Sequence, residues 1–428
     1  MAGPGGHQGS RTNWAGNVAY RAARHHRPTT VEELQALVAA ASRLRPLGTG
    51  HSFNRLADTD GDQVSVAGLP PVLKIDTTGQ TVTVAAGMRY GELTGRLHDQ
   101  GWALHNLGSL PHISVAGAVA TGTHGSGDGN GNLATAVRAL QMVTADGELV
   151  TLERQRDGDD FAGAVVALGA LGVVTRLTLD LVPAFEIRQY VYEGIGLGRL
   201  LDSFDDIVSA AYSVSVFTDW REPVSARVWV KQRVGDSSTH AQERWLDARP
   251  ADGPRHPLAG MPPENCTAQL GEPGPWHERL PHFRLGFTPS RGAELQSEYF
   301  VPRASAVPAV EALAGLRGQV APVLQTAEIR TVAADDLWLS PAYRRDSVAL
   351  HFTWVADEAA VAPVVAAVEA ALTPFDCRPH WGKVFSIRPD VVAGRYERWS
   401  GFQALADRLD PAGVLRNDWL SDYLSRGA

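Results

Sequence analysis

The chain contains only two cysteines among its 428 residues, Cys266 and Cys377. They lie far apart, and neither belongs to a CxxC pattern or to a Cys/His set with the spacing of metal ligands. Zinc sites, iron–sulfur clusters and a disulfide framework therefore find no support. We expect two reduced thiols and no bound metal.

The sequence also has little clustered positive charge and no long apolar run. Its 39 Lys and Arg residues are scattered and its formal net charge is −8, whereas binding to a phosphate backbone requires a basic surface. No window approaches the roughly 18 consecutive apolar residues of a membrane span, and residues 1–16 lack the apolar segment of a signal peptide. We expect a cytoplasmic monomer that binds neither nucleic acid nor membranes.

The rest of the composition is typical of a soluble globular enzyme. Apolar residues make up 44% of the chain and charged residues 20%, which is ordinary for a folded protein. A chain of 428 residues exceeds what one hydrophobic core normally organises. We therefore expect two domains, with a core large enough to enclose a large cofactor.

Residues 29–182 alternate short β-rich runs with helical segments. Thr30 can cap the helix that follows it, because Glu33 lies at the reciprocal position of a capping box. A second helix is expected at 91–101. The β-rich runs are 73–76, 80–84, 139–143, 147–152 and 172–179, with turns at 78–79 and 145–147 that favour hairpins.

From Phe185 to about Pro374 the pattern changes to β-type segments that alternate with amphipathic helices. Strands are expected at 212–218, 226–230, 295–300 and 347–355, and helices at 306–316 and 357–372. This pattern predicts a second, mixed domain that covers the first, with the proline-rich run 249–275 as a long surface excursion. Near the C-terminus, a helix from Trp399 is expected to stop at Asp410 and to be followed by an extended end.

The run from Pro46 to Asn54, PLGTGHSFN, places one histidine between a glycine turn and a small hydroxyl residue. Gly48 and Gly50 can take positive φ and let the backbone approach a flat ligand, to which His51 presents a ring nitrogen. Such an arrangement suits the tethering of a flavin. The same run also fits an ordinary turn in which His51 is a satisfied polar residue.

A second run, from Asn106 to Gly127, reads NLGSLPHISVAGAVATGTHGSG and is crowded with Gly, Ser, Thr and Ala. Small residues leave backbone N–H groups free to bind pyrophosphate oxygens without Lys or Arg. A flexible linker has a similar composition, but linkers lack apolar residues such as Leu107, Ile113 and Val119. The run therefore predicts the binding of a long, phosphate-bearing cofactor.

Several polar residues lie within apolar stretches of the second domain. They are Gln296, Glu328, Arg330, His351, Thr353 and Lys383. Period-two alternation places 328 and 330 on one face of a strand, and 351 and 353 on one face of another. Taken singly, they fit a solvated ion pair, a satisfied core histidine and a surface lysine. Their coincidence with the loop around His51 favours an enclosed polar site.

Seven motifs follow one another along the chain: GTGHSFN, NLGSLPHISVAGAVATGTHGSG, LQSEYF, EIR, HFTW, PHWGK and RNDWL. In this order they resemble the alditol oxidases of the vanillyl-alcohol oxidase and PCMH flavoprotein superfamily, over nearly the whole chain. The resemblance implies an α+β fold of two domains, a PCMH-type FAD-binding domain and a mixed α/β cap that binds the substrate. The FAD domain would span 13–183, the cap 184–385, and the segment 386–428 would return to the FAD domain.

The same resemblance implies the residues of the site. FAD would be attached covalently through His51 to its 8α-methyl group. The other FAD contacts would be Pro46, Leu47, Gly48, Thr49, Gly50, Ser52, Ser109, Ser114, Gly117, Thr121, Gly122, Thr123, His124 and Val173. The substrate pocket would comprise Ser109, Gln296, Glu328, Arg330, His351, Thr353 and Lys383.

The implied reaction oxidises the terminal C1 hydroxyl of a polyol such as xylitol or sorbitol to the aldose. A hydride would pass from C1 to N5 of FAD, while His351, or Lys383 beside Arg330, acts as the base or stabilises the alkoxide. O₂ would then be reduced to hydrogen peroxide, and Gly108 would leave room for it. A polyol needs a polar pocket, because each buried unpaired polar group costs roughly 1–3 kcal/mol.

Two other functions stay open. The GxGHS loop, the Glu-x-Arg pair and the HWxK run are shared with sugar-lactone oxidoreductases, so an aldonolactone or gulonolactone oxidase or dehydrogenase is the alternative. A non-catalytic sugar-binding or flavin-storing module is the other. The joint presence of His351 and Lys383 beside the Glu328 and Arg330 pair argues against that module.

Overall fold

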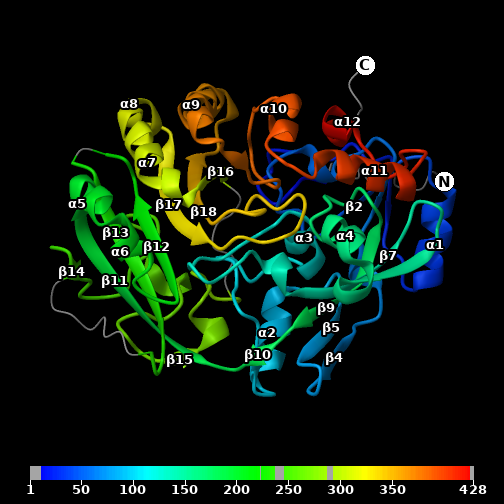
Figure 1. The fold of residues 1–428 in the computed structure, drawn as a ribbon, viewed down its shortest axis with the longest axis horizontal. Helices are drawn as coiled ribbons and strands as arrows, with labels where there is room; N and C mark the ends of the chain where they lie inside the picture. The colour runs from blue at the N-terminus through cyan, green and yellow to red at the C-terminus, as the bar shows by residue number, and fades with distance from the viewer. Residues whose placement is uncertain (1–10, 222, 237–244, 287–292, 425–428) are drawn as a thin grey trace, which may run out of the picture.

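A computed structural model describes residues 11–221, 223–236, 245–286 and 293–424. The chain forms two halves that lie side by side, the N-terminal strands and helices in one and a large antiparallel sheet in the other (Figure 1). The first ten residues belong to the N-terminal segment in which no signal peptide is expected, and they lie outside the described residues. Both helices and strands occur in each half, which is the expected α+β class.

The first half contains a small parallel sheet that holds the histidine loop. Helix α1 (Val31–Ala40) connects β1 (Arg24–His26) to β2 (Leu44–Pro46), and both strands pair with β3 (Asp62–Val64). Thr30 caps α1 as predicted, accepting a hydrogen bond from the Glu33 N–H at 3.1 Å. The Glu33 carboxylate accepts from the Thr29 N–H rather than from Thr30.

A five-stranded antiparallel sheet completes this half. Its order is β4 (Leu73–Asp76), β5 (Thr81–Ala85), β9 (Val173–Asp180), β7 (Val137–Val143) and β8 (Leu149–Glu153). The two predicted hairpins are confirmed as β4–β5 and β7–β8. Helices α2 (Tyr90–His98), α3 (Val115–Ala120) and α4 (Arg154–Val165) accompany the sheet, and β6 (Trp102–Ala103) pairs with β10 (Val182–Pro183).

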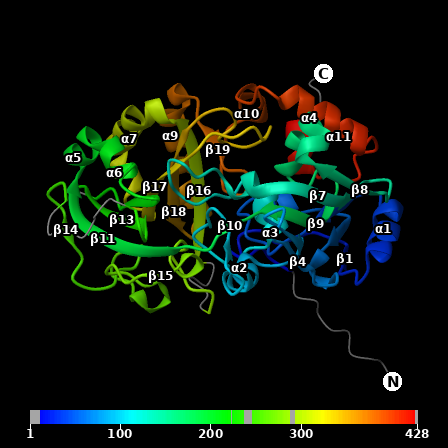
Figure 2. The same cartoon turned by 60° about the horizontal axis from the view of Figure 1, so that its bottom comes forward.

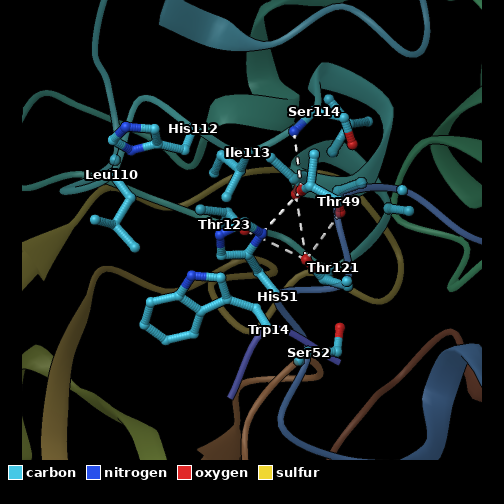
Figure 3. Close-up of a pocket in the computed structure, with 18 of the residues that line it drawn as sticks. Trp14, Thr49, His51, Ser52, Leu110, His112, Ile113, Ser114, Thr121 and Thr123 are labelled. Atoms are coloured by element: carbon cyan, nitrogen blue, oxygen red, sulfur yellow. Dashed lines mark hydrogen bonds between the residues drawn. The ribbon is translucent and has the colours of Figure 1, made fainter. Parts of the chain in front are cut away.

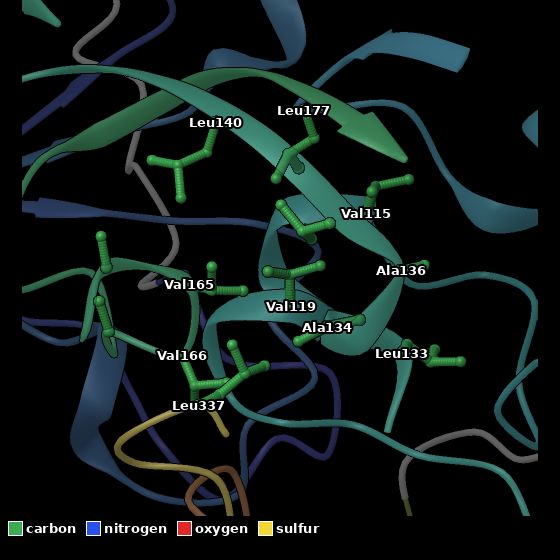
Figure 4. Close-up of a cluster of buried hydrophobic side chains, with 14 of the residues drawn as sticks. Val115, Val119, Leu133, Ala134, Ala136, Leu140, Val165, Val166, Leu177 and Leu337 are labelled. Carbon is green, nitrogen blue, oxygen red and sulfur yellow. The ribbon is translucent and has the colours of Figure 1, made fainter. Parts of the chain in front are cut away.

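Helix α3 occupies the middle of the Gly/Ser/Thr-rich run and was not predicted. Its Val115 and Val119 are fully buried and meet Leu140 of β7 and Leu177 of β9 in the core (Figure 4). Its Ala116 and Gly117 are only partly buried and, together with Val119, line a cavity. The apolar residues threaded through the run therefore anchor it to the core, while its small residues leave the other side open.

A nine-stranded sheet forms the second half, and its strand pairs are antiparallel. The order is β14 (Arg249–Pro250), β11 (Glu186–Gly196), β13 (Ser225–Arg233), β12 (Ser213–Thr218), β17 (Leu324–Val332), β18 (Ser347–Val355), β16 (Glu294–Pro302) and β19 (Arg378–Pro379), with β15 (Gly274–Pro275) paired to β11. The sequence did not predict β11, although its residues alternate between buried and exposed. The run 249–275 contributes β14 and β15 and is more than a surface excursion.

Helices cover one face of this sheet (Figure 1). They are α5 (Leu197–Asp202), α6 (Phe204–Val208), α7 (Ala306–Gly315), α8 (Arg317–Val320) and α9 (Glu358–Leu372). The segment Glu358–Phe375 is apolar and long enough to cross a membrane by composition. In the fold its buried residues Val361, Val365 and Val368 pack into the core beneath the helices, as expected of a helix that covers a sheet.

The last three helices return to the first half. They are α10 (Pro389–Gly394), α11 (Trp399–Leu409) and α12 (Asp418–Leu424), and α11 lies against α4 (Figure 2). The expected extended end after Asp410 is wrong, because α12 is helical. Asn417 accepts a hydrogen bond from the Leu420 N–H at 2.8 Å and so caps α12. Leu420 and Tyr423 then turn into the core.

Candidate active site and cofactor cavity

A cavity of about 1010 Å³ lies between the two halves, lined by the histidine loop, the Gly/Ser/Thr-rich run and the open face of the large sheet. This volume lies at the upper end of the roughly 300–1,000 Å³ typical of small-molecule sites. All the predicted site residues line it except Gly122. Gly122 has φ of 67° and faces Pro341, so it shapes the turn after α3.

The histidine loop starts where β2 ends. Gly50 has φ of 71°, which favours glycine. The expectation that Gly48 also takes positive φ is wrong, and Gly48 is needed for another reason: a Cβ there would lie 2.7 Å from Ser114 Oγ. The loop therefore packs directly on the Gly/Ser/Thr-rich run, which joins the first two motifs.

His51 projects from this loop into the cavity (Figure 3). Its Nδ1 lies 2.9 Å from Thr49 Oγ1, and its ring stacks on Trp14 with the ring centroids 5.3 Å apart. Burial, then the positive charge of Lys383, lowers the pKa of His51 to about 4. The imidazole is therefore neutral at pH 7 and keeps one nitrogen lone pair.

The histidine loop and the adjacent Ser114 and Gly117, together called the cradle, fit a phosphate-bearing flavin nucleotide. Among the described residues, the backbone N–H groups from 48 to 52 donate to no backbone carbonyl. The buried Ser114 Oγ has no hydrogen-bond partner within that part of the chain, and a Cβ at Gly117 would lie 2.8 Å from it. Free N–H groups and a free hydroxyl beside glycines are what the oxygens of a pyrophosphate require.

The opposite wall of the cavity is polar and comes from three adjacent strands. The register pairs His351 of β18 with Glu298 of β16 on one side and with Glu328 of β17 on the other. Neighbouring residues such as Ile329 and Leu350 point to the helix-covered core instead. Period-two alternation thus produces the predicted faces and sets acidic and basic groups in a row.

Glu298 is the central acidic group of this wall, and it is not among the site residues predicted from the sequence. Its Oε1 accepts from Arg330 Nη2 at 2.6 Å and lies 3.1 Å from His124 Nε2, while its Oε2 lies 3.6 Å from His351 Nδ1. Burial alone would raise the pKa of Glu298, but His124, Arg330 and His351 hold it well below the usual range. Glu298 follows Gln296 by two residues in LQSEYF, so the alternation used elsewhere would have found it.

Arg330 and Glu328 face the cavity together, as predicted, with Arg330 Nε 3.5 Å from Glu328 Oε2. The closer partner of Glu328 is a second missed residue, His282, whose Nε2 lies 2.9 Å from Glu328 Oε1. Burial opposes ionisation of Glu328, but Arg330 and His282 outweigh it and hold its pKa far below the usual range. Ser109 is 3.4 Å from Arg330 Nη1.

Lys383 lies in the loop that closes one end of the polar wall. Its Nζ donates to Gln296 Oε1, and its backbone carbonyl accepts from Asn54 Nδ2 at 2.9 Å. Since Asn54 ends the histidine loop, this bond ties the PHWGK motif to GTGHSFN. Burial lowers the pKa of Lys383 to about 8, although Glu298 opposes the shift.

His351 lies between Glu298 and Thr353. Its Nδ1 faces the Glu298 carboxylate and its Nε2 lies 3.3 Å from Thr353 Oγ1. Burial lowers the pKa of His351 in spite of Glu298, so the ring is neutral at pH 7. With the proton on the nitrogen that faces the carboxylate, Nε2 is left with a lone pair.

Family models match both ends of the chain. One described as an FAD binding domain matches residues 22–153, and one described as D-arabinono-1,4-lactone oxidase matches residues 289–423. These matches cover, respectively, the cradle around His51 and the wall that carries Glu328 and His351.

Whole-length similarities agree with this division. An alditol oxidase from a Streptomyces species is 54% identical over 96% of this chain and 98% of its own length. An L-gulono-1,4-lactone dehydrogenase of Mycobacterium tuberculosis is 30% identical over 95% of this chain and 97% of its own length. The crystal structure of a cholesterol oxidase from B. sterolicum superposes with a TM-score of 0.75 at 16% identity, over 97% of this chain and 96% of that one, and shares its fold. The chain therefore belongs to the alditol oxidase family and carries an FAD-binding domain.

Proposed function

We propose that the protein is an FAD-dependent oxidase that converts the terminal C1 hydroxyl of an alditol, such as xylitol or sorbitol, to the aldose and reduces O₂ to hydrogen peroxide. The observation that carries the proposal is the polar wall opposite the His51 loop. It offers acceptors at Glu328 and donors at Arg330 and Lys383. A substrate with a hydroxyl on every carbon needs such a row, and the 54% identity to an alditol oxidase agrees with it.

The residues that we expect to bind FAD are those of the cradle and its neighbours. The nucleotide would lie along residues 46–52 and 108–124 and against Val173, with a covalent bond from His51. A neutral imidazole has the lone pair that such a bond requires, and the pKa of His51 is lowered to about 4. When bound, FAD supplies the acceptor for the hydride of the substrate carbon and returns the electrons to O₂.

The residues toward the substrate divide the proton chemistry. His351 Nε2 accepts the proton of the C1 hydroxyl, since its Nδ1 faces Glu298. Arg330 and Lys383 donate hydrogen bonds to the oxygen as negative charge develops on it. Ser109, Gln296, Glu328 and Thr353 bind the other hydroxyls. This choice makes His351 the base and Lys383 the stabiliser.

The substrate class is tested with a matched panel. Purified protein is mixed with xylitol, sorbitol, glycerol and L-gulono-1,4-lactone while O₂ uptake and peroxide are recorded. We expect peroxide with the polyols and little with the lactone. Turnover of the lactone alone would instead favour a sugar-lactone oxidoreductase, like the relative that is 30% identical. Turnover only with an added dye as electron acceptor would indicate a dehydrogenase.

The proposal also places the protein in the cytoplasm as a monomer that acts on small molecules and has no nucleic-acid or membrane partner. The net charge of −8 argues against a nucleic-acid partner, and the packing of α9 on the large sheet argues against a membrane-spanning role for that helix. Light scattering after gel filtration should give a mass near 45.9 kDa. Twice that mass would make the monomer wrong.

A further inference from the structure

A lysine outside the proposed site lies buried in the middle of the large sheet. Lys231 of β13 is 1% exposed. Its Nζ donates to the Leu280 carbonyl and lies 3.3 Å from His282 Nδ1. A buried ammonium group is costly unless hydrogen bonds compensate it, so its position next to an imidazole needs an explanation.

His282 connects this lysine to the cavity. Its Nε2 lies 2.9 Å from Glu328 Oε1, and its backbone N–H donates to the Ser109 carbonyl at 3.2 Å. Phe217 and Trp229 meet the ring edge to face, at centroid distances of 5.3 and 5.2 Å. Apolar walls thus confine the ring, and its two nitrogens face Lys231 on one side and Glu328 on the other.

The chemistry of the three groups fixes the direction of the hydrogen bonds. At pH values below about 7, where Lys231 is an ammonium group, it can only donate, so His282 Nδ1 accepts. The proton of the neutral ring is then on Nε2, which donates to the Glu328 carboxylate. Burial, then Lys231, lowers the pKa of His282 to about 4, in agreement with a neutral ring.

The other charged groups nearby do not disturb this direction. Arg330 and His351 face Glu328 from β17 and β18, and Cys266 lies near Lys231. Burial lowers the pKa of Lys231 to about 7, while the negative charge of Glu328 opposes the shift. Arg330 donates a hydrogen bond to Glu298. The contact from His282, which Lys231 adjoins, is therefore a separate interaction that stabilises the Glu328 carboxylate.

We propose that Lys231 and His282 form a hydrogen-bond relay that holds Glu328 as an ionised, oriented acceptor for a substrate hydroxyl, and thereby sets substrate affinity and its dependence on pH. The inference rests on the proposed function, because it takes Glu328 as a contact of the alditol. Lys231 is a positioning residue in this account and touches neither substrate nor cofactor.

The chain offers a matched control across the strand. Gln189 of β11 is the register partner of Lys231, is 0% exposed, and donates to the Thr267 and Ala268 carbonyls. Lys231→Met and Gln189→Met each remove one buried donor from neighbouring positions. Only Lys231→Met breaks the relay. Lys231→Gln keeps a donor that can reach toward His282.

We expect Lys231→Met to raise KM for xylitol by about tenfold, the effect of losing one charge-assisted hydrogen bond, and to lower kcat much less. Without the relay the pKa of Glu328 rises, so the acid limb of kcat/KM moves to higher pH. Lys231→Gln should stay closer to the wild type. The relay would be wrong if Lys231→Met had the same KM and the same acid limb as Gln189→Met. If Lys231→Met does not fold, His282→Phe takes its place with the same expectations.

A second readout does not depend on turnover. In protein labelled with ¹⁵N-histidine, the His282 signal, assigned by its loss in His282→Phe, should report a proton on Nε2 in the wild type and in Gln189→Met. The proton should stay on Nε2 in Lys231→Gln, which keeps a donor to Nδ1. It should no longer be confined to Nε2 in Lys231→Met, which removes that donor. A proton on Nδ1 in the wild type would refute the relay even in an active enzyme, and failure of every substrate with the expected tautomer would instead refute the proposed function.

Discussion

Among the individual side chains, Glu298 organises the proposed base. It is 2% exposed and bonded to Arg330 and His124, and it faces His351 Nδ1. Glu298→Gln should lower the rate of flavin reduction under anaerobic conditions by a substantial part of the roughly 10²–10⁴-fold that a placed base contributes. The reason is that an amide can offer its NH₂ to His351 and no longer fixes the ring proton on Nδ1.

Glu369→Gln is the control for this substitution. Glu369 is also a buried glutamate of the second half, bonded to Tyr299 and Ser386, but it does not line the cavity. It should change the midpoint of urea unfolding without changing the reduction rate. Equal rates in both variants would remove Glu298 from the account of catalysis.

His51 carries the prediction about the cofactor bond. His51→Ala should give protein whose flavin is released into the supernatant by acid precipitation, because the ring nitrogen proposed to form the covalent bond is gone. His112→Ala is the control, since His112 lines the same cavity from the Gly/Ser/Thr-rich run, and its flavin should stay with the pellet. Flavin that remains attached in His51→Ala would show that the tether is elsewhere.

Lys383 carries a prediction about pH. Its pKa is lowered to about 8 by burial, and only the ammonium form donates all three hydrogens. As pH rises through about 8 the charge is lost, so kcat/KM for a polyol should fall on the alkaline side. Lys383→Met should show a lower kcat/KM at pH 7 and no alkaline limb there. An unchanged limb in the variant would assign it to another group.

What the sequence could predict among these side chains depended on local pattern. Glu328, Arg330, His351 and Thr353 were placed because a strand fixes which residues share a face. His282 could not be found this way, since it lies in residues 279–282, which form neither a helix nor a strand. Its role depends on contacts with β13 and β17, far away in sequence, and no local pattern reports them.

Among the helices and strands, α12 shows how a short terminal element stabilises the first half. Leu420 is 0% exposed and lies in the same core as Phe402 of α11. Leu420→Ala should lower the free energy of unfolding by about 2–5 kcal/mol, the usual cost of such a cavity. Val391→Ala is the control, because Val391 of α10 is 38% exposed and should change it by less than about 0.5 kcal/mol.

Urea unfolding followed by tryptophan fluorescence would measure both variants. If Leu420→Ala unfolds at the wild-type midpoint, α12 contributes nothing to the core. The sequence predicted an extended end here because Pro411 and Gly413 stop α11, and the cap at Asn417 that restarts a helix was overlooked. Elements with clear periodicity and turns, such as the β7–β8 hairpin, were predicted correctly.

In the molecule as a whole, the proposed site is formed by two walls that belong to different halves of the chain. The cradle around His51 comes from the first half and the row of Glu298, His351 and Glu328 from the second. The Asn54 bond to the Lys383 carbonyl and the His282 bond to the Ser109 carbonyl hold the walls together. The domain boundaries at 183 and 385 stay a prediction, which limited proteolysis between the halves would test.

Alditol oxidation by the bound flavin is measured by mixing purified yellow protein with xylitol in the absence of O₂ and following the flavin absorbance. We expect bleaching at a rate that rises with polyol concentration to a limit, followed by recovery of the colour and release of one hydrogen peroxide per flavin when O₂ is admitted. A flavin that keeps its absorbance with every alditol but is bleached by a sugar lactone would contradict it.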